Sequence, residues 1–244
     1  MKLFFLSLRS FSFYIGYILS ALLAGLIACL IGPFMQVNKR QKIFSLWPKF
    51  VNWLLYFTCD IKIHIEGMEN ILKPPCIIVS NHQGQWETFY FQYFFNPMCT
   101  LLKRELLYIP LWGWGLFLLN PISINRNKPR QAVRKVLKEG TKKLEEGYYL
   151  LIFPEGSRMK KGEVGKYTRS AFELALKSNT KILPIIHNSG DCWPAHQFFK
   201  LPGKINVKIG KPLKVITPGK SARDVEAWTR GQLELMNGSI TRLN

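Results

Sequence analysis

Residues 76–87 read CIIVSNHQGQWE, and this stretch decides the fold class. The apolar run at residues 76–80 is typical of a buried strand, and a polar turn that contains Gly84 follows it. An aromatic helix is predicted from Trp86. This order places His82 at the carboxyl edge of a sheet, where open α/β sheets bind their ligands.

Strand-like and helix-like segments alternate along the chain after this stretch as well. Strands are predicted at residues 60–66, 76–80, 98–102, 122–124, 148–153, 182–186 and 205–209. Helices are predicted at residues 86–95, 129–146, 170–177 and 222–236, with Pro129 in a first turn and Gly147 after a last one. This alternation predicts one α/β domain over residues 59–244, with a sheet covered by helices on both faces.

Residues 1–58 are predicted to anchor the chain in a membrane. Residues 11–34 carry no charge, and about 20 apolar residues suffice to cross a bilayer. Residues 43–57 are shorter and aromatic, which favours the level of the lipid headgroups. A true span and a two-helix anchor in one leaflet, broken at Gly25 or at Gly32 and Pro33, both stay open. The downstream flank has more cations, so a single span is predicted to leave the C-terminal domain on the cytoplasmic face, as on a bacterial inner membrane.

The charge and the cysteines narrow the possible function classes. The chain has 34 Lys and Arg against 15 Asp and Glu, a net charge of +19, which predicts an anionic partner. The apolar N-terminus favours a membrane surface over nucleic acid as that partner. The five cysteines show no CxxC spacing, so neither a disulfide framework nor a zinc site is expected.

The spacing of His82 and Glu87 indicates how the two side chains could act together in acid–base chemistry. Within one continuous helix, two residues five positions apart point about 140° away from each other. The two side chains can meet only if His82 lies in the turn and Glu87 lies in the first helical turn. Glu87 would then hold one ring nitrogen and leave the other free to accept a proton. A histidine that merely caps its helix is the alternative for this stretch taken alone.

Cationic residues follow other predicted strands. Lys103 follows the strand at residues 98–102, Arg126 follows residues 122–124, and the turn Glu155, Gly156, Ser157 and Arg158 follows residues 148–153. Backbone N–H groups and a guanidinium at such a turn suit a phosphate. These groups are expected near the edge of the sheet that carries His82.

Together, the ordered motifs resemble the glycerolipid acyltransferase family, most closely its members that act on 1-acyl-glycerol-3-phosphate. The NHxxxxD block falls on Asn81 and His82, with Glu87 in place of Asp. The later blocks match KRELLYIPLWGWG at Lys103, Glu105 and Gly113, INR at Arg126, FPEGSR at residues 153–158 and LPI at Pro184. The family's F-K-x-G segment is replaced by Tyr167, Thr168, Arg169 and Ser170.

The resemblance implies an α/β fold with a mixed sheet flanked by helices. It also implies acyl transfer from acyl-CoA or acyl-carrier protein to a lysophospholipid, without a metal or another cofactor. His82 would be the general base and Glu87 its orienting carboxylate. The substrate phosphate would be bound by Lys103, Arg126, Glu155, Gly156, Ser157 and Arg158. Asn81, Glu105 and Pro184 would support the site.

Three other readings compete with this interpretation. One is an acyltransferase for another lysophospholipid or a lyso-aminolipid, because the segment at residues 167–170 departs from the family pattern. Another is a basic protein without catalysis that binds membranes or nucleic acid. A zinc hydrolase is the third, but His64, His82, His187 and His196 form no HExxH pair, and His187 and His196 are expected in a loop around Trp193.

Overall fold

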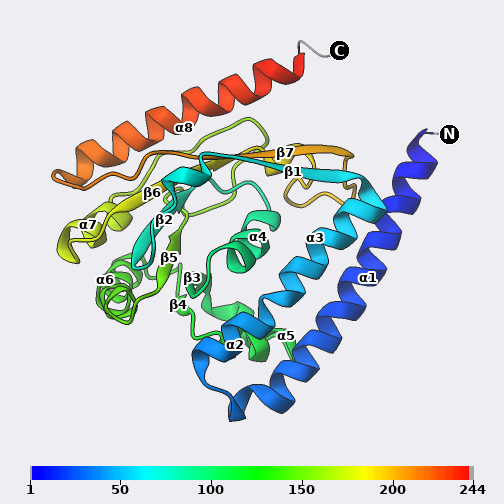
Figure 1. Cartoon of the computed structure of the whole chain (residues 1–244), viewed down its shortest axis with the longest axis horizontal. Coiled ribbons are helices and arrows are strands. Elements are labelled where there is room, and N and C mark those ends of the chain that lie inside the picture. Colours follow the sequence, from blue (N-terminus) through cyan, green and yellow to red (C-terminus); the bar gives the residue numbers. More distant parts are fainter. Residues whose placement is uncertain (1, 242–244) are drawn as a thin grey trace.

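The computed structural model describes residues 2–241, and within them seven strands form one sheet in the order β1-β7-β6-β2-β5-β3-β4 (Figure 1). All seven predicted strands are confirmed to within two residues. Their bounds are β1 (Ile61–Glu66), β2 (Cys76–Ser80), β3 (Met98–Lys103), β4 (Ile122–Ile124), β5 (Tyr149–Ile152), β6 (Ile182–His187) and β7 (Gly203–Ile209).

The sheet is mixed, as predicted. Strand β2 lies between β5 and β6 and is parallel to both, and β3 and β4 continue the parallel arrangement beyond β5. Strand β7 is antiparallel to β6 and parallel to β1. The carboxyl ends of β2, β3, β4, β5 and β6 therefore meet at one edge of the sheet, which brings the turns that follow them together.

Helices cover both faces of the sheet, which confirms the predicted layering. Their bounds are α1 (Lys2–Ile31), α2 (Val37–Phe44), α3 (Leu46–Cys59), α4 (Trp86–Phe94), α5 (Trp112–Leu118), α6 (Pro129–Glu145), α7 (Ser170–Lys177) and α8 (Pro218–Thr241). Side chains alternate between the two faces along a strand. In β2, Cys76 and Ile78 join the core of α1, α3 and α4, whereas Ile77 and Val79 join the core of α6, α7 and α8.

The helices differ from the sequence prediction at two places. Helix α8 begins four residues before the expected start, because Pro218 suits a first helical turn, where its missing N–H costs nothing. Helix α5 was not predicted at all. Two of its seven residues are glycines, Gly113 and Gly115, which have low helix propensity. Helices α4, α6 and α7 match the prediction to within one residue.

The N-terminal residues form a helical hairpin. Helix α1 starts at Lys2, well before the expected residue 11, and its most apolar 18-residue window has a mean hydropathy of 2.3. In the described part of the chain this is the one helix whose length and composition would allow it to cross a membrane. The chain turns at Gly32 and Pro33 and returns through α2 and α3 beside α1 (Figure 1). Gly25 does not break α1, but allows it to approach the backbone of Leu111 closely.

One side of the hairpin is part of the domain core. Phe13 on α1 is fully buried, and its ring centroid lies 5.2 Å from that of Trp193. The backbone N–H of Lys200 donates to Ser10 Oγ at 2.9 Å, and Lys200 Nζ donates to Tyr14 Oη. Helix α1 is therefore fixed to the segment that follows β6 and η4 (Ser189–Asp191), rather than loosely tethered.

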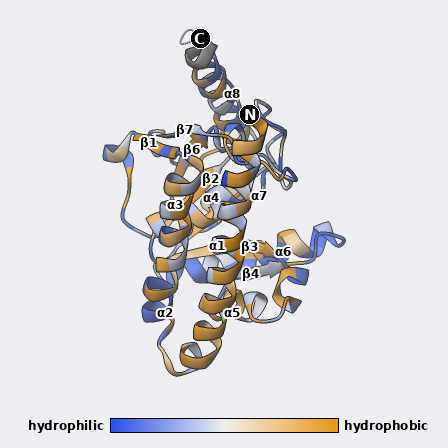
Figure 2. Ribbon diagram, turned by 90° about the vertical axis from the view of Figure 1, so that its right-hand side faces the viewer, coloured by the Kyte–Doolittle hydropathy of each residue, from blue (hydrophilic) through white to orange (hydrophobic). Residues whose placement is uncertain are grey.

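The other side of the hairpin is apolar and exposed. Hydrophobic residues run along most of α1 and α3 in Figure 2. The exposed large side chains on these two helices include Phe4, Leu8, Phe11, Leu19, Leu23, Phe50, Trp53 and Phe57. Soluble proteins seldom expose a contiguous apolar surface of this kind, and such a surface marks a site of interaction with a membrane or a protein.

Two aromatic residues on α1 test how the hairpin is held. Replacing Phe13 with Ala should lower the free energy of unfolding by about 3–5 kcal/mol, because it empties a filled site in the core. Replacing Phe11 with Ala, on the exposed side of the same helix, should change it little. Thermal unfolding of the detergent-purified variants measures both effects. Equal midpoints for the two variants would contradict the docking of α1 described above.

Candidate active site

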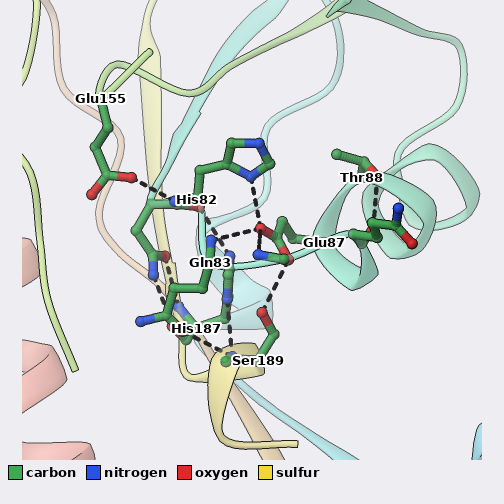
Figure 3. Close-up of polar contacts among 11 residues, drawn as sticks. His82, Gln83, Glu87, Thr88, Glu155, His187 and Ser189 are labelled. Atoms are coloured by element: carbon green, nitrogen blue, oxygen red, sulfur yellow. Dashed lines mark hydrogen bonds and ion pairs between the residues drawn. The ribbon is translucent and has the colours of Figure 1, made fainter. Parts of the chain in front are cut away.

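His82 lies in the turn between β2 and α4. Strand β2 ends at Ser80 and α4 begins at Trp86, so Glu87 lies in the first turn of the helix. His82 Nδ1 and Glu87 Oε1 are 2.8 Å apart, and both side chains are buried (Figure 3). The predicted meeting of these two side chains is confirmed. Gly84 is needed in this turn, because a Cβ there would lie only 2.7 Å from the carbonyl oxygen of Trp193.

The Glu87 carboxylate accepts four hydrogen bonds. Oε1 accepts from His82 Nδ1 and from the backbone N–H groups of Gln83 and Gly84, and Oε2 accepts from Ser189 Oγ at 3.0 Å (Figure 3). Burial alone would raise the pKa of Glu87. The hydrogen bonds from His82 Nδ1 and from the N–H of Gly84 outweigh burial and hold this pKa well below its usual range. Glu87 is therefore ionised.

The ionised carboxylate fixes the tautomer of His82. A carboxylate without its proton can only accept hydrogen bonds, so His82 Nδ1 carries the hydrogen that joins the two groups. Nε2 is then left with a lone pair. The imidazole ring is held in place by the ring of Phe153, which stacks on it at a centroid distance of 4.1 Å. Nε2 can accept a proton, and Glu87 can stabilise the imidazolium that results.

His187 lies beneath the site, in β6, and not in the loop that the sequence analysis expected. The strand extends one residue further than predicted and carries His187 as its last residue, fully buried. Its Nδ1 accepts from the N–H of Ser189, so Nε2 carries the hydrogen and donates to the carbonyl oxygen of Asn81 at 3.0 Å. Burial lowers the pKa of His187, so this second imidazole is neutral.

Asn81 connects β2 to β6 through its side chain. Asn81 Nδ2 donates to the His187 carbonyl oxygen at 2.9 Å, and the His187 N–H donates to Asn81 Oδ1 at 3.1 Å. Beside this pair, Gln83 Oε1 accepts from the N–H of Gly190. Asn81 was predicted to support the site. His187, Ser189 and Gln83 were missed, because no local sequence pattern links residues that lie more than 100 positions apart.

The carboxyl group of Glu155 contacts the protein backbone, whereas the sequence predicted a contact with the substrate phosphate. Its Oε2 accepts from the N–H of His82 at 2.7 Å (Figure 3). Its Oε1 accepts from the N–H of Gly165 at 3.0 Å. Burial raises the pKa of Glu155 to about 7, against the two N–H donors and with help from the charge of Glu87. Both carboxyl oxygens accept hydrogen bonds from the protein backbone, so this geometry favours a positioning role for Glu155 over the predicted contact with the phosphate.

The loop after β5 holds the backbone of His82 on both sides. Besides the bond from His82 N–H to Glu155, the N–H of Met159 donates to the His82 carbonyl oxygen at 2.7 Å. Gly156 has a φ of +73°, a conformation that glycine adopts freely, and it starts this loop. Ser157 and Arg158 come next and are exposed. The same loop thus contacts the histidine and presents a guanidinium to the solvent.

The predicted cations lie at the expected edge of the sheet. Lys103 ends β3, Arg126 follows β4 and Arg158 follows β5, so all three are at the carboxyl ends of strands parallel to β2. Each is exposed, and none forms an ion pair with another residue within residues 2–241. Their positive charges are therefore free to meet an anion.

The two remaining predicted residues lie further from the histidine. Glu105 lies in η3 (Arg104–Tyr108), and its Oε2 is buried without a hydrogen-bond partner. Pro184 lies in the middle of β6, where it packs against Gly210. Within residues 2–241 no group of three or more His, Cys, Asp or Glu side chains could hold a metal ion.

Comparisons with known proteins agree with this geometry. Residues 62–188, which contain His82, Glu87, the cations and His187, match the family described as Acyltransferase. The chain is 38% identical to the 1-acyl-sn-glycerol-3-phosphate acyltransferase of Pseudomonas aeruginosa over 228 residues, 91% of this chain and 89% of that protein. It is 31% identical to the Saccharomyces cerevisiae protein of the same name over 160 residues, 63% of this chain and 52% of that one.

A solved structure has the same fold. The crystal structure of the 1-acyl-sn-glycerophosphate acyltransferase PlsC from Thermotoga maritima superposes with a TM-score of 0.79 at 23% identity, covering 97% of this chain and 98% of that one. At this identity the similarity establishes the fold, including the N-terminal helices. The family match and the Pseudomonas relative establish more: the chain belongs to the acyltransferase family.

Proposed function

We propose that the protein transfers a fatty acyl group from a thioester to the free hydroxyl of 1-acyl-sn-glycerol-3-phosphate, which gives phosphatidic acid for phospholipid synthesis. The observation that carries the proposal is the contact of 2.8 Å between His82 Nδ1 and the buried carboxyl group of Glu87. The relative from Pseudomonas aeruginosa, named for this reaction, aligns over nearly the whole chain and supports the choice of acceptor.

His82 acts as the general base in this proposal. Nε2 removes the proton of the acceptor hydroxyl, and the oxygen attacks the carbonyl carbon of the thioester. The tetrahedral intermediate then collapses, the carbon–sulfur bond breaks, and the imidazolium returns the proton to the leaving thiolate. Acyl-CoA or acyl-carrier protein supplies the thioester, and no further cofactor takes part. Glu87 stabilises the transient imidazolium and keeps the ring in the required tautomer.

The exposed cations bind the phosphate of the acceptor. Arg158 can meet two phosphate oxygens at once, Lys103 and Arg126 add charge, and Ser157 and the N–H groups after Gly156 add hydrogen bonds. Glu155 does not touch the substrate, but positions His82 through its backbone N–H. Glu105 and Pro184 support the strand ends from which these residues project.

The hairpin of α1 and α3 attaches the enzyme to the membrane from which its lipid substrates come. Its exposed apolar side chains support this attachment. The cations that follow α1, Lys39, Arg40 and Lys42, suit the anionic cytoplasmic surface. A domain held there receives lysolipid from the side and thioester from the water.

Replacing His82 with Ala should lower the rate of acyl transfer by about 10²–10⁴-fold, because the proton of the hydroxyl then has no base. Release of free CoA thiol from palmitoyl-CoA with lysophosphatidate measures this rate on detergent-purified protein. Glu87→Asp is the matched control and should stay active, since the family pattern has Asp there. A His82→Ala protein that folds normally and keeps more than a few per cent of the rate would rule out the assigned base.

Replacing Arg158 with Ala should raise the KM for lysophosphatidate by roughly 10–150-fold, as expected for a lost charged hydrogen bond worth about 1.5–3 kcal/mol. The KM for palmitoyl-CoA should change little. Lys160→Ala, which removes an exposed cation two residues further along, is the control and should leave both constants unchanged. If only the thioester KM rises in Arg158→Ala, the phosphate lies elsewhere.

The raised pKa of Glu155 predicts a pH effect on stability. The folded protein keeps a proton on Glu155 up to pH about 7, whereas the unfolded chain loses it near 4.3. The stability that this proton contributes is thus fully present below the unfolded pKa and is lost as the pH rises through 7. Glu155→Gln should lack this loss, on the order of 1–3 kcal/mol between pH 4.5 and 8. Parallel stability curves for the two proteins, followed by urea unfolding, would refute the assignment.

A further inference from the structure

Helix α6 carries a row of exposed cations. Arg130, Arg134, Lys138 and Lys142 are all exposed and follow each other at intervals of four residues, so successive members are neighbours about one turn apart on a row that slants around the helix. We call these four residues the α6 cation row. At 1.5 Å per residue the row is about 18 Å long. This length suits the surface of a macromolecule better than a single small anion.

The fold itself does not need these charges. Like charges four residues apart repel each other and destabilise a helix, and cations near the start of a helix oppose its dipole. The first turn of α6 contains Arg130 and no acidic residue. Within residues 2–241, Lys142 is the one member of the row in an ion pair, with Glu146 at 3.9 Å. The helix packs through Val136, Gly140 and Leu144 on its other face.

The row begins at the edge of the sheet that carries the active site. Helix α6 starts at Pro129, shortly after β4 ends at Ile124. His82 follows β2, and β2 and β4 run in the same direction through β5 and β3. The amino end of α6 and the catalytic histidine therefore lie at the same edge. A partner on this helix can direct a flexible arm toward Nε2 of His82.

The sheet separates the α6 cation row from the apolar hairpin. Helix α6 belongs to the core with α7 and α8, whereas α1, α3 and α4 belong to the core on the other face. In Figure 1 the hairpin and α6 lie on opposite sides of the molecule. With the hairpin in the membrane, α6 is left to the aqueous phase. This arrangement favours a soluble acidic partner over an anionic lipid surface.

We propose that the α6 cation row docks an acidic carrier protein, which delivers the acyl group to His82 as a thioester on its prosthetic arm. The proposal rests on the function proposed above and specifies its donor. Complementary charge accelerates the encounter and orients the partner. The row therefore affects the affinity and the association rate of the carrier. The chemical step depends on His82. Acyl-CoA needs no protein surface and does not use the row.

The triple variant R130E/R134E/K138E tests the proposal against two donors with one acceptor. With palmitoyl-carrier protein, kcat/KM should fall at least tenfold, mostly through KM, whereas with palmitoyl-CoA it should stay within twofold of the unaltered enzyme. The reaction of the unaltered enzyme with the carrier should also slow as salt rises from 50 to 300 mM. The reaction of the variant with the carrier should lose this dependence.

The variant K204E/K211E/K214E is the matched control, because it makes the same change of charge at exposed lysines in and after β7, toward the other end of the sheet. It should keep its rates with both donors. Equal losses with both donors in R130E/R134E/K138E, or no loss with either, would overturn the proposal. So would a loss that appears on anionic vesicles and vanishes in neutral detergent, which would assign the row to the membrane.

Binding without turnover separates this proposal from the function on which it rests. The unloaded carrier protein is titrated onto the full-length enzyme in neutral detergent at low salt. Binding that R130E/R134E/K138E abolishes and K204E/K211E/K214E retains supports the docking, even if the enzyme transfers no acyl group to lysophosphatidate. Absence of binding to the unaltered enzyme overturns the docking, even if palmitoyl-CoA is used at full rate.

Discussion

A carboxylate that is buried and ionised must be surrounded by hydrogen-bond donors, since removing its charge from water is otherwise very costly. Glu87 meets this requirement with four donors: His82 Nδ1, the N–H groups of Gln83 and Gly84, and the hydroxyl of Ser189. Three of them come from the turn after β2, but the fourth comes from η4, just after β6. The electrostatics of the site therefore depend on β2 and β6 being neighbours in the sheet.

The same dependence extends to the backbone of His82. The loop after β5 binds its N–H through Glu155 and its carbonyl oxygen through Met159, while Asn81 is bonded to His187 on the opposite side. Three adjacent strand ends thus fix one short turn. The general base proposed above would therefore need little reorganisation when the substrates arrive, and positioning of this kind is a large part of enzymatic rate enhancement.

The sequence was sufficient for features that depend on nearby residues. Apolar runs bounded by glycines and prolines predicted the seven strands. The spacing of His82 and Glu87 predicted that their side chains meet. Both features depend on local geometry. Ser189 and His187 contact residues more than 100 positions away, and only the strand order brings them there. Glu155 was predicted to contact the substrate, because its partners in the structure, the N–H groups of His82 and Gly165, cannot be read from its motif. Helix α5 was not predicted, because two of its seven residues are glycines, which have low helix propensity.

The hydrogen bond between Glu87 and Ser189 also determines when the site can form during synthesis of the chain. A ribosome completes the hairpin, β2 and α4 about a hundred residues before it reaches Ser189. Until β6 emerges and inserts beside β2, one oxygen of Glu87 lacks its donor and Asn81 has no partner strand. A chain whose synthesis has not yet reached β6 therefore has its apolar N-terminal helices but no assembled site. The site is complete only when β6 has paired with β2.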